Sequence, residues 1–283
     1  MIRGGPAVPH PYRQAAAGIV LGAGVVLALG ACTSFSAVAA DAADSGADAA
    51  SDANSSAQDA RSEAGSAPGA YAAAVLRDAP IAYFRLDDVG VVETGSIFDE
   101  ISKSHFGAVH GKPVFGAAGA IGNGVAFDGA AWIELGDRYG FPGVAPFTIE
   151  VFVKPSGTSF GHVFTKQQRA NPKNGYAVTT DTALVMERFL NGGSSKTPPQ
   201  TLSTNEFWHV ACTFDGTKMA VYVNGTPRGK AADSDDVPAQ SSPAIIGAAS
   251  TSGEYGFDGT IDELAIYDKA LDPSQIAAHY LAR

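Results

Sequence analysis

Short segments in which apolar and polar residues alternate occur along most of the chain, from residue 71 to residue 267. Gly, Pro, Asn and Asp separate them at spacings of about ten residues, as between the strands of an all-β sandwich or barrel. The 3.6-residue period of an amphipathic helix is missing until the C-terminal end. The pattern therefore predicts strands throughout this region.

One short helix is predicted to close the chain, over residues 273–281. Asp272 is suited to the N-cap, Pro273 takes the first helical position, and Gln275 stands at the third. These residue types in this order are typical of a helix start.

The clearest local signal is a hairpin centred on the dipeptide Asp215-Gly216. Such a dipeptide favours a two-residue turn. Counting outward from it pairs Cys212 with Met219 and Val210 with Val221, so the apolar residues of both strands share one face. The same count places His209 opposite Tyr222, where we interpret the histidine as a hydrogen-bonded packing residue and not a base.

Two further strands stand out. Residues 147–154 carry apolar side chains at both alternating positions, which predicts a strand covered partly on both faces. Residues 261–267 predict a strand near the C-terminus. Turn residues at Asp128-Gly129 separate two other apolar stretches.

The N-terminal segment has the features of a secretory signal. Arg3 and Arg13 precede an uncharged apolar stretch, residues 15–31. The sequence Leu29-Gly30-Ala31-Cys32 resembles the bacterial lipobox, which implies that residues 1–31 are a lipoprotein signal peptide and that Cys32 is lipidated. A membrane anchor at Cys32 would follow. By the same resemblance, Thr33 in place of Asp is compatible with the outer membrane of the bacterial envelope. The alternative is an uncleaved anchor helix.

Residues 32–70 consist mainly of Ala, Ser, Asp and Gly, and have no aromatic residue after Phe35. Such a composition buries too little apolar surface to offset chain entropy, so a disordered, extended tether is predicted. A transient helix is the alternative, because alanine is abundant.

Charge and cysteine content narrow the range of partners. The formal net charge is −10, and Lys and Arg are sparse and scattered. Nucleic acid is therefore excluded as an expected partner, because phosphate contacts need a basic surface. The two cysteines indicate no disulfide framework, and Cys212 within an apolar stretch is expected to be buried.

Several motifs resemble, in order, those of laminin-G-like, concanavalin A-like sandwich domains of bacterial surface proteins. They are Tyr83-Phe84-Arg85-Leu86-Asp87-Asp88, Gly122-Asn123-Gly124-Val125-Ala126-Phe127-Asp128-Gly129, Phe147-Thr148-Ile149-Glu150-Val151, Trp208-His209-Val210-Ala211 and Gly259-Thr260-Ile261-Asp262-Glu263-Leu264. The resemblance covers residues 71–283. It implies an all-β, two-sheet antiparallel jelly-roll sandwich that serves as a binding module.

Because some such sandwiches are glycoside hydrolases, the carboxylates matter. Retaining glycosidases need two carboxyl groups about 5 Å apart. Glu150 stands alone among apolar neighbours. Asp262 and Glu263 are adjacent, so they are expected on opposite faces of a strand. We therefore expect no enzymatic activity, and keep a glycoside hydrolase as an alternative.

The expected ligand is a carbohydrate or an extracellular protein, bound by loops on a rigid sandwich. The candidate loops are residues 166–174, with Gln167, Arg169 and Asn171, and residues 192–199. Trp132 could stack on a sugar ring. The alternatives are that these loops are merely solvated, that Trp132 packs beneath a loop, and that the domain is structural or adhesive and has no sugar site.

A structural calcium ion is the one cofactor that the resemblance implies. Similar sandwiches hold it between the first and last strands, so Asp262 and either Asp87 or Asp88 are the predicted ligands. Carboxylate oxygens are the ligands that calcium takes. The alternative is that these residues cap turns or form ion pairs.

Overall fold

The computed structural model describes residues 69–89, 96–181 and 183–283. The predicted signal peptide, Cys32 and nearly all of the predicted tether lie outside these residues. No helix of the described part of the chain is long and apolar enough to span a membrane.

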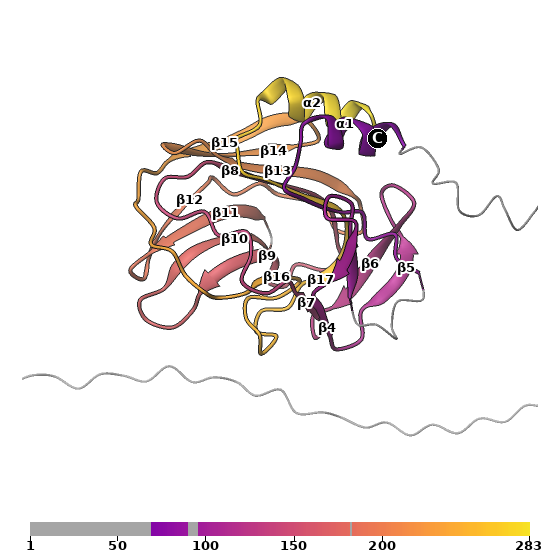
Figure 1. The fold of residues 1–283 in the computed structure, drawn as a ribbon, viewed down its shortest axis with the longest axis horizontal. Coiled ribbons are helices and arrows are strands. Elements are labelled where there is room, and N and C mark those ends of the chain that lie inside the picture. Colours follow the sequence, from indigo (N-terminus) through magenta and orange to yellow (C-terminus); the bar gives the residue numbers. More distant parts are fainter. Residues whose placement is uncertain (1–68, 90–95, 182) are drawn as a thin grey trace, which may run out of the picture. The chain divides into compact units, whose positions relative to one another are not determined.

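Two antiparallel sheets form a sandwich, which confirms the predicted all-β class (Figure 1). The first sheet has the order β15 (Thr226–Ala232), β14 (Lys218–Val223), β13 (Trp208–Phe214), β8 (Phe147–Pro155), β17 (Asp258–Tyr267), β6 (Asn123–Asp128) and β5 (Val114–Ala118), with β1 (Ala82–Phe84) also paired to β17. The second has the order β12 (Gly193–Lys196), β11 (Leu184–Leu190), β10 (Asn174–Thr180), β9 (Gly161–Gln168), β16 (Ala244–Ile246), β7 (Trp132–Glu134) and β4 (Ala108–His110). A small separate sheet pairs β2 (Ile97–Asp99) with β3 (Ser104–Phe106).

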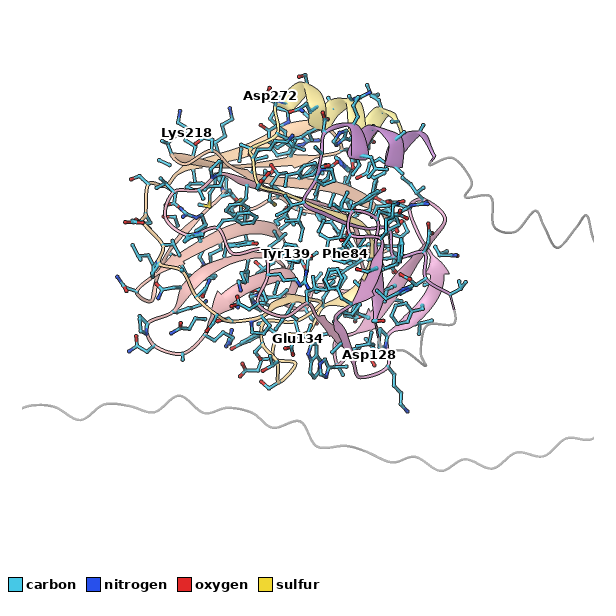
Figure 2. All side chains as sticks on the ribbon, in the orientation of Figure 1. Phe84, Asp128, Glu134, Tyr139, Lys218 and Asp272 are labelled. Atoms are coloured by element: carbon cyan, nitrogen blue, oxygen red, sulfur yellow. The ribbon has the colours of Figure 1, made fainter. Side chains whose placement is uncertain are left out.

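The main core lies between the two large sheets. Val151, Val210 and Ile266 contribute from the first sheet, and Phe164 and Met186 from the second. Figure 2 shows Phe84 and Tyr139 in the middle of the sandwich, where their rings meet at 6.5 Å. Burial of each such side chain is worth about 1.5–3 kcal/mol, so the alternation of apolar residues accounts for the two-layer architecture.

A second apolar cluster covers the other face of the first sheet. Helices α1 (Ala70–Arg77) and α2 (Pro273–Leu281) lie side by side there (Figure 1). Tyr71 and Ile276 from the helices pack with Phe152 and Tyr267 from the sheet. Strand β8 is therefore buried on both faces, as predicted.

The prediction of a single helix is half right. Helix α2 has the predicted bounds, and the Gln275 side chain accepts a hydrogen bond of 2.9 Å from the Asp272 backbone N–H. Helix α1 was not predicted, because an eight-residue helix is marginal by itself and depends on packing.

The β13–β14 hairpin has a different register from the predicted one. Val210 pairs with Val223, and Cys212 pairs with Val221. Asp215 Oδ1 accepts hydrogen bonds from the backbone of Thr217 and Lys218, each at 2.8 Å, so Gly216 and Thr217 form the turn. Gly216 has φ +96°, as the first position of a type II′ turn requires. The shift is two residues along the partner strand, so every side chain keeps its predicted face.

Candidate functional site

The outer face of the second sheet lies away from both helices (Figure 1). Because side chains alternate along a strand, Phe164 and Val178 point into the core, whereas Gln167 and Thr179 belong to this outer face. Figure 2 shows Glu134 of β7 on this side of the molecule, and Lys218 and Asp272 on the opposite side. Two neighbouring hollows lie on the outer face.

The first, which we call the aromatic hollow, has a volume of about 300 Å³. Its lining residues come from the start of β9 and the residue before it, the β9–β10 loop, strands β11 and β12, and the loop before β17. They are Phe160, His162, Arg169, Lys173, Glu187, Phe189, Lys196 and Tyr255. Phe160 and Tyr255 meet edge to face at 5.4 Å and remain 44% and 51% exposed. Two large aromatic rings are thus available for contact with a ligand.

Three cations surround these rings. Arg169 lies 4.9 Å from the centre of the Tyr255 ring, and its Nε is 3.1 Å from Glu254. The Lys173 ammonium lies 3.4 Å from the centre of the Phe189 ring. Cation–π contacts of this kind hold a charged group over an aromatic face. Lys196 pairs with Glu187 at 3.0 Å.

His162 forms part of the hollow's wall and is only 3% exposed. Burial, together with the charges of Arg169 and Lys173, lowers the pKa of its imidazole to about 3. The ring is therefore neutral near pH 7, with one nitrogen that donates and one that accepts. Its Nδ1 has no hydrogen-bond partner among the described residues.

Other buried polar atoms of the outer face also lack partners in the described part of the chain. They include Thr179 Oγ1, in the residue that pairs with His162 across β9 and β10, and Gln167 Oε1. A buried polar atom left unpaired costs about 1–3 kcal/mol. Such atoms concentrated on one face indicate a surface adapted to polar partners that come from outside the chain.

The second hollow, of about 210 Å³, adjoins the first because Arg169 lines both. We call it the serine hollow; it is lined by Gln167, Arg169, Ser242, Pro243, Ile245, Ala249, Ser250 and Thr251. Gln167 Nε2 donates a 3.3 Å hydrogen bond to the Ala249 carbonyl, whereas its Oε1 has no partner among the described residues.

The structure brings two of the predicted ligand residues together, since Gln167 and Arg169 both line the serine hollow. Asn171 is exposed in the β9–β10 loop, and its peptide bond to Pro172 is cis. That loop is shorter than predicted, because β9 extends to Gln168 and β10 begins at Asn174. Likewise, β12 occupies much of the predicted loop 192–199.

Trp132 lies on the outer face but lines neither hollow. Its ring stacks on His110 at 4.8 Å with an interplanar angle of 9°. Gly253 also lies so close to the indole ring that a Cβ added to this glycine would be only 2.5 Å from it. The 248–256 loop therefore lies directly against Trp132, in agreement with the alternative that it packs beneath a loop.

Sequence reasoning missed the aromatic members of the site. Phe160 and His162 are two residues apart at the start of β9, but Tyr255 is far from them in the sequence and is brought beside them by a 3.0 Å hydrogen bond from the His162 backbone N–H to the Tyr255 carbonyl. The alternation of β9 identifies His162 as an outer-face residue only once its inner residues are known.

The predicted calcium ligands lie near the β5–β6 turn. Asp262 Oδ2 accepts hydrogen bonds from the backbone N–H groups of Ala120 and Ile121, at 2.8 and 3.0 Å. Asp87 Oδ1 accepts one from Asn123, at 2.8 Å. The structure thus brings Asp87 and Asp262 to one turn, whereas Asp88 contacts the β2–β3 sheet through the Phe98 backbone N–H at 3.5 Å.

These oxygens fit a hard cation in part. Asp262 Oδ1 is buried and has no hydrogen-bond partner in the described residues. Burial, together with the charges of Glu263 and Asp87, raises the pKa of Asp262 to about 8, although two backbone hydrogen bonds oppose the shift. The described residues contain no group of three His, Cys, Asp or Glu side chains placed to hold a metal ion. Backbone carbonyls and water would have to complete a calcium shell.

Strand β17 does not alternate regularly at Asp262 and Glu263, contrary to the expectation. A bulge lies between Asp262 and Ala265, and Glu263 has φ +53°. A bulge inserts an extra residue and redirects the side chains beside it. Glu263 bonds to the Tyr83 hydroxyl and interacts electrostatically with Asp262.

Glu150 is not isolated either. His209 Nε2 lies 2.7 Å from its Oε1, His279 Nδ1 lies 2.9 Å from its Oε2, and the hydroxyls of Tyr71 and Tyr267 donate to it at 3.3 and 3.2 Å. The carboxylate is fully buried beneath the two helices. The network therefore joins strands to helices and lines neither hollow. His209 is hydrogen-bonded as predicted, but its partner is Glu150.

Comparison with known proteins agrees with this fold. Domain 4 of AbnA, a GH43 extracellular arabinanase from Geobacillus stearothermophilus solved in complex with arabinotriose, is 20% identical, with a TM-score of 0.55 over 70% of this chain and 96% of that domain. The binding domain of Paraclostridial Mosquitocidal Protein 1 is 15% identical (TM-score 0.55), and that of botulinum neurotoxin serotype D is 12% identical (TM-score 0.56). These two matches cover 72% and 74% of this chain, but only 52% of each toxin chain.

A search of curated proteins finds no significant match. The family profile described as the concanavalin A-like lectin/glucanases superfamily, of laminin G type, matches residues 127–277. That match spans β7 to α2 and more than half of the chain, and it includes both hollows of the outer face. The chain therefore belongs to the concanavalin A-like lectin/glucanases superfamily.

Proposed function

We propose that the outer face of the second sheet binds an oligosaccharide and that the domain is a non-catalytic binding module. The observation that carries this proposal is the exposed pair Phe160 and Tyr255 beside buried polar atoms that have no partner within the described part of the chain. A sugar ring presents an apolar face to aromatic rings, and its hydroxyl groups satisfy both donors and acceptors.

The similar structures support a binding role. One was solved with arabinotriose, and two others are binding domains of toxins. The two carboxylates nearest the aromatic hollow, Glu187 and Glu254, are held in ion pairs with Lys196 and Arg169. Such pairing suits a wall that positions a ligand better than an acid and a base that transfer protons.

The proposal is tested by measuring the affinity of the full-length protein for a panel of soluble oligosaccharides and polysaccharides, by affinity electrophoresis and then calorimetry. We expect Tyr255→Ala and Phe160→Ala each to weaken binding by about tenfold, since an aromatic contact is worth about 0.5–1.5 kcal/mol beyond area burial. Leu281→Ala is the matched control, because Leu281 is 79% exposed and lies on α2, which packs against the first sheet.

Two results would overturn the proposal. If no member of the panel binds while the protein captures an extracellular protein, the ligand is not a sugar. If no ligand of either kind binds, the domain is structural or adhesive. An equal loss of affinity in Leu281→Ala would show that the effect is not local to the outer face.

We further propose that Cys32 carries a lipid and that residues 32–70 tether the sandwich to the bacterial envelope, with the outer membrane as its location. Support comes only from the sequence Leu29-Gly30-Ala31-Cys32 and from the Ala-, Ser-, Asp- and Gly-rich stretch that follows. Labelled palmitate should be incorporated by the wild type and not by Cys32→Ser, which should be released into the medium. Labelling of Cys32→Ser would contradict the assignment.

A structural calcium ion at Asp87 and Asp262 is a separate proposal. It is supported by the buried Asp262 oxygen that no described residue bonds to, near a second carboxylate. At such a site the ion would neutralise two carboxylates and join β17 to the turn before β6.

A further inference from the structure

We infer that the sugar bound at the aromatic hollow is negatively charged and carries a carboxylate or a sulfate group. This inference rests on the proposed function and specifies its ligand class. It follows from the balance of charge in the hollow, from the way its cations are held, and from the state of His162.

The charge of the hollow opposes that of the whole chain. The formal net charge of the chain is −10, yet the hollow is lined by Arg169, Lys173 and Lys196 and by one carboxylate, Glu187. Glu254, which pairs with Arg169 from the edge, still leaves three cations facing two carboxylates. A local excess of positive charge on an acidic protein attracts anions to that place and few others.

Of the three cations that line the hollow, Arg169 and Lys196 each pair with a carboxylate, whereas Lys173 is held by an aromatic ring. Lys173 lies over Phe189, and no carboxylate lies within ion-pair distance of it in the described part of the chain. Burial lowers the pKa of its ammonium, and the charges of Arg169 and Lys196 add to this, although Glu187 opposes them. An anion placed beside Lys173 would therefore relieve a repulsion that the folded chain sustains.

His162 shows the same imbalance from the hollow's wall. It is buried, its Nδ1 has no partner among the described residues, and burial together with the charges of Arg169 and Lys173 keeps its imidazole neutral. The wall therefore adds hydrogen-bonding capacity without adding charge. A bound anion would offset the two cations and raise the pKa of His162, which gives a readout at the site itself.

A sugar is favoured over other anions because the exposed rings of Phe160 and Tyr255 flank the cations. A simple inorganic anion would leave both rings without a contact. A ring-shaped ligand with an apolar face and an acidic substituent uses the rings and the cations together.

The experiment compares three probes with the full-length protein by calorimetry at low salt: an oligogalacturonate, the same oligomer with its carboxylates methyl-esterified, and a sulfated galactan oligomer. We expect at least one acidic probe to bind about tenfold more tightly than the esterified one, because a hydrogen bond to a charged group is worth about 1.5–3 kcal/mol. The preference should shrink as salt is raised. The two acidic probes distinguish carboxylate from sulfate recognition.

Matched variants locate the effect. Lys173→Gln and Lys196→Gln should lose most of the acidic preference while still binding the neutral ester. Lys218→Gln, on the opposite side of the molecule (Figure 2), should not. In the wild type, the acidic probe should change the NMR shifts of the His162 ring protons.

The outcomes are separable. Equal affinity for acidic and esterified probes would overturn the charge inference and leave the sugar-binding proposal standing. Binding of neither class, in this set and in the wider panel, would overturn both. An acidic preference that survives Lys173→Gln and Lys196→Gln together would overturn the assignment to this hollow.

Discussion

Glu150 and His279 are 129 residues apart in the sequence, yet His279 Nδ1 lies 2.9 Å from Glu150 Oε2 in a fully buried contact. The other ring nitrogen of His279 lies 2.8 Å from Asp78 Oδ2. An imidazole that donates to carboxylates from both nitrogens is protonated. One charged ring on α2 thus joins strand β8 to the residue that ends α1.

This arrangement predicts a loss of stability as pH rises. Burial lowers the pKa of His279, but the hydrogen bonds and charges of Glu150 and Asp78 outweigh it, so the folded-state pKa is raised. A raised folded pKa contributes stability that is fully present below the unfolded value of about 6.5 and is lost as pH rises through the folded pKa.

Urea unfolding from pH 6 to pH 9 measures this effect. The free energy of unfolding should fall over the range for the wild type, and the fall should be smaller in His279→Gln. The other groups facing His279, namely Glu150, Asp78, Tyr71 and Tyr267, are unchanged in that variant. Identical pH profiles for the two proteins would show that His279 is not charged in the folded state.

Removal of Glu150 is the second prediction. Burial alone would raise the pKa of Glu150, but the hydrogen bonds of His209 and His279 outweigh it and lower the pKa to about 2. Glu150→Ala leaves both histidines without this partner, and breaking a buried ion pair costs about 3–5 kcal/mol. Denaturant unfolding near pH 7 should show this loss.

Glu254→Ala is the control for that measurement. This substitution removes the ion pair with Arg169, and the Glu254 side chain that it removes is 53% exposed. Such pairs contribute about 0–1 kcal/mol. Comparable losses in the two variants would contradict the structural role assigned to the buried network.

The period-two pattern predicted the sheets because side chains alternate between the two faces of a strand, so the alternation of apolar residues shows which faces are buried. Strand β8, with apolar residues at both parities, is the clearest case. The hairpin register could not be obtained this way, because both registers place Cys212 and Val221 on the core side. The Asp215 side chain decides between them through bonds to Thr217 and Lys218.

The site was predictable only in part for a related reason. Gln167 and Arg169 belong to one short stretch, so local polarity pointed to them. Tyr255 and Phe160 reach the same hollow from different connections. Likewise, Glu150 looked isolated because its partners His209 and His279 come from another strand and from the terminal helix.

Calcium addition is the third prediction. If the ion occupies the site at Asp87 and Asp262, millimolar calcium should raise the melting temperature of chelator-treated protein, since a ligand that binds only the folded state stabilises it. Asp262→Asn should remove the response, because it removes one of the two charges. Asp128→Asn is the control and should retain the response, because Asp128 belongs to another turn, where its Oδ1 accepts a 2.9 Å hydrogen bond from the Ala130 backbone N–H. An unchanged melting temperature in the wild type would rule out the ion.

Truncation of Trp132 distinguishes the two roles considered for it. The indole stacks on His110 and contacts Gly253, so it supports the 248–256 loop, which carries Tyr255. Trp132→Ala should therefore destabilise the fold, by about 3–5 kcal/mol at most for a large aromatic side chain that is only partly buried. Sugar affinity should fall less than in Tyr255→Ala, because the indole lines neither hollow. Unfolding and calorimetry on the same preparations check both parts, and a loss of binding with unchanged stability would instead make Trp132 a direct ligand contact.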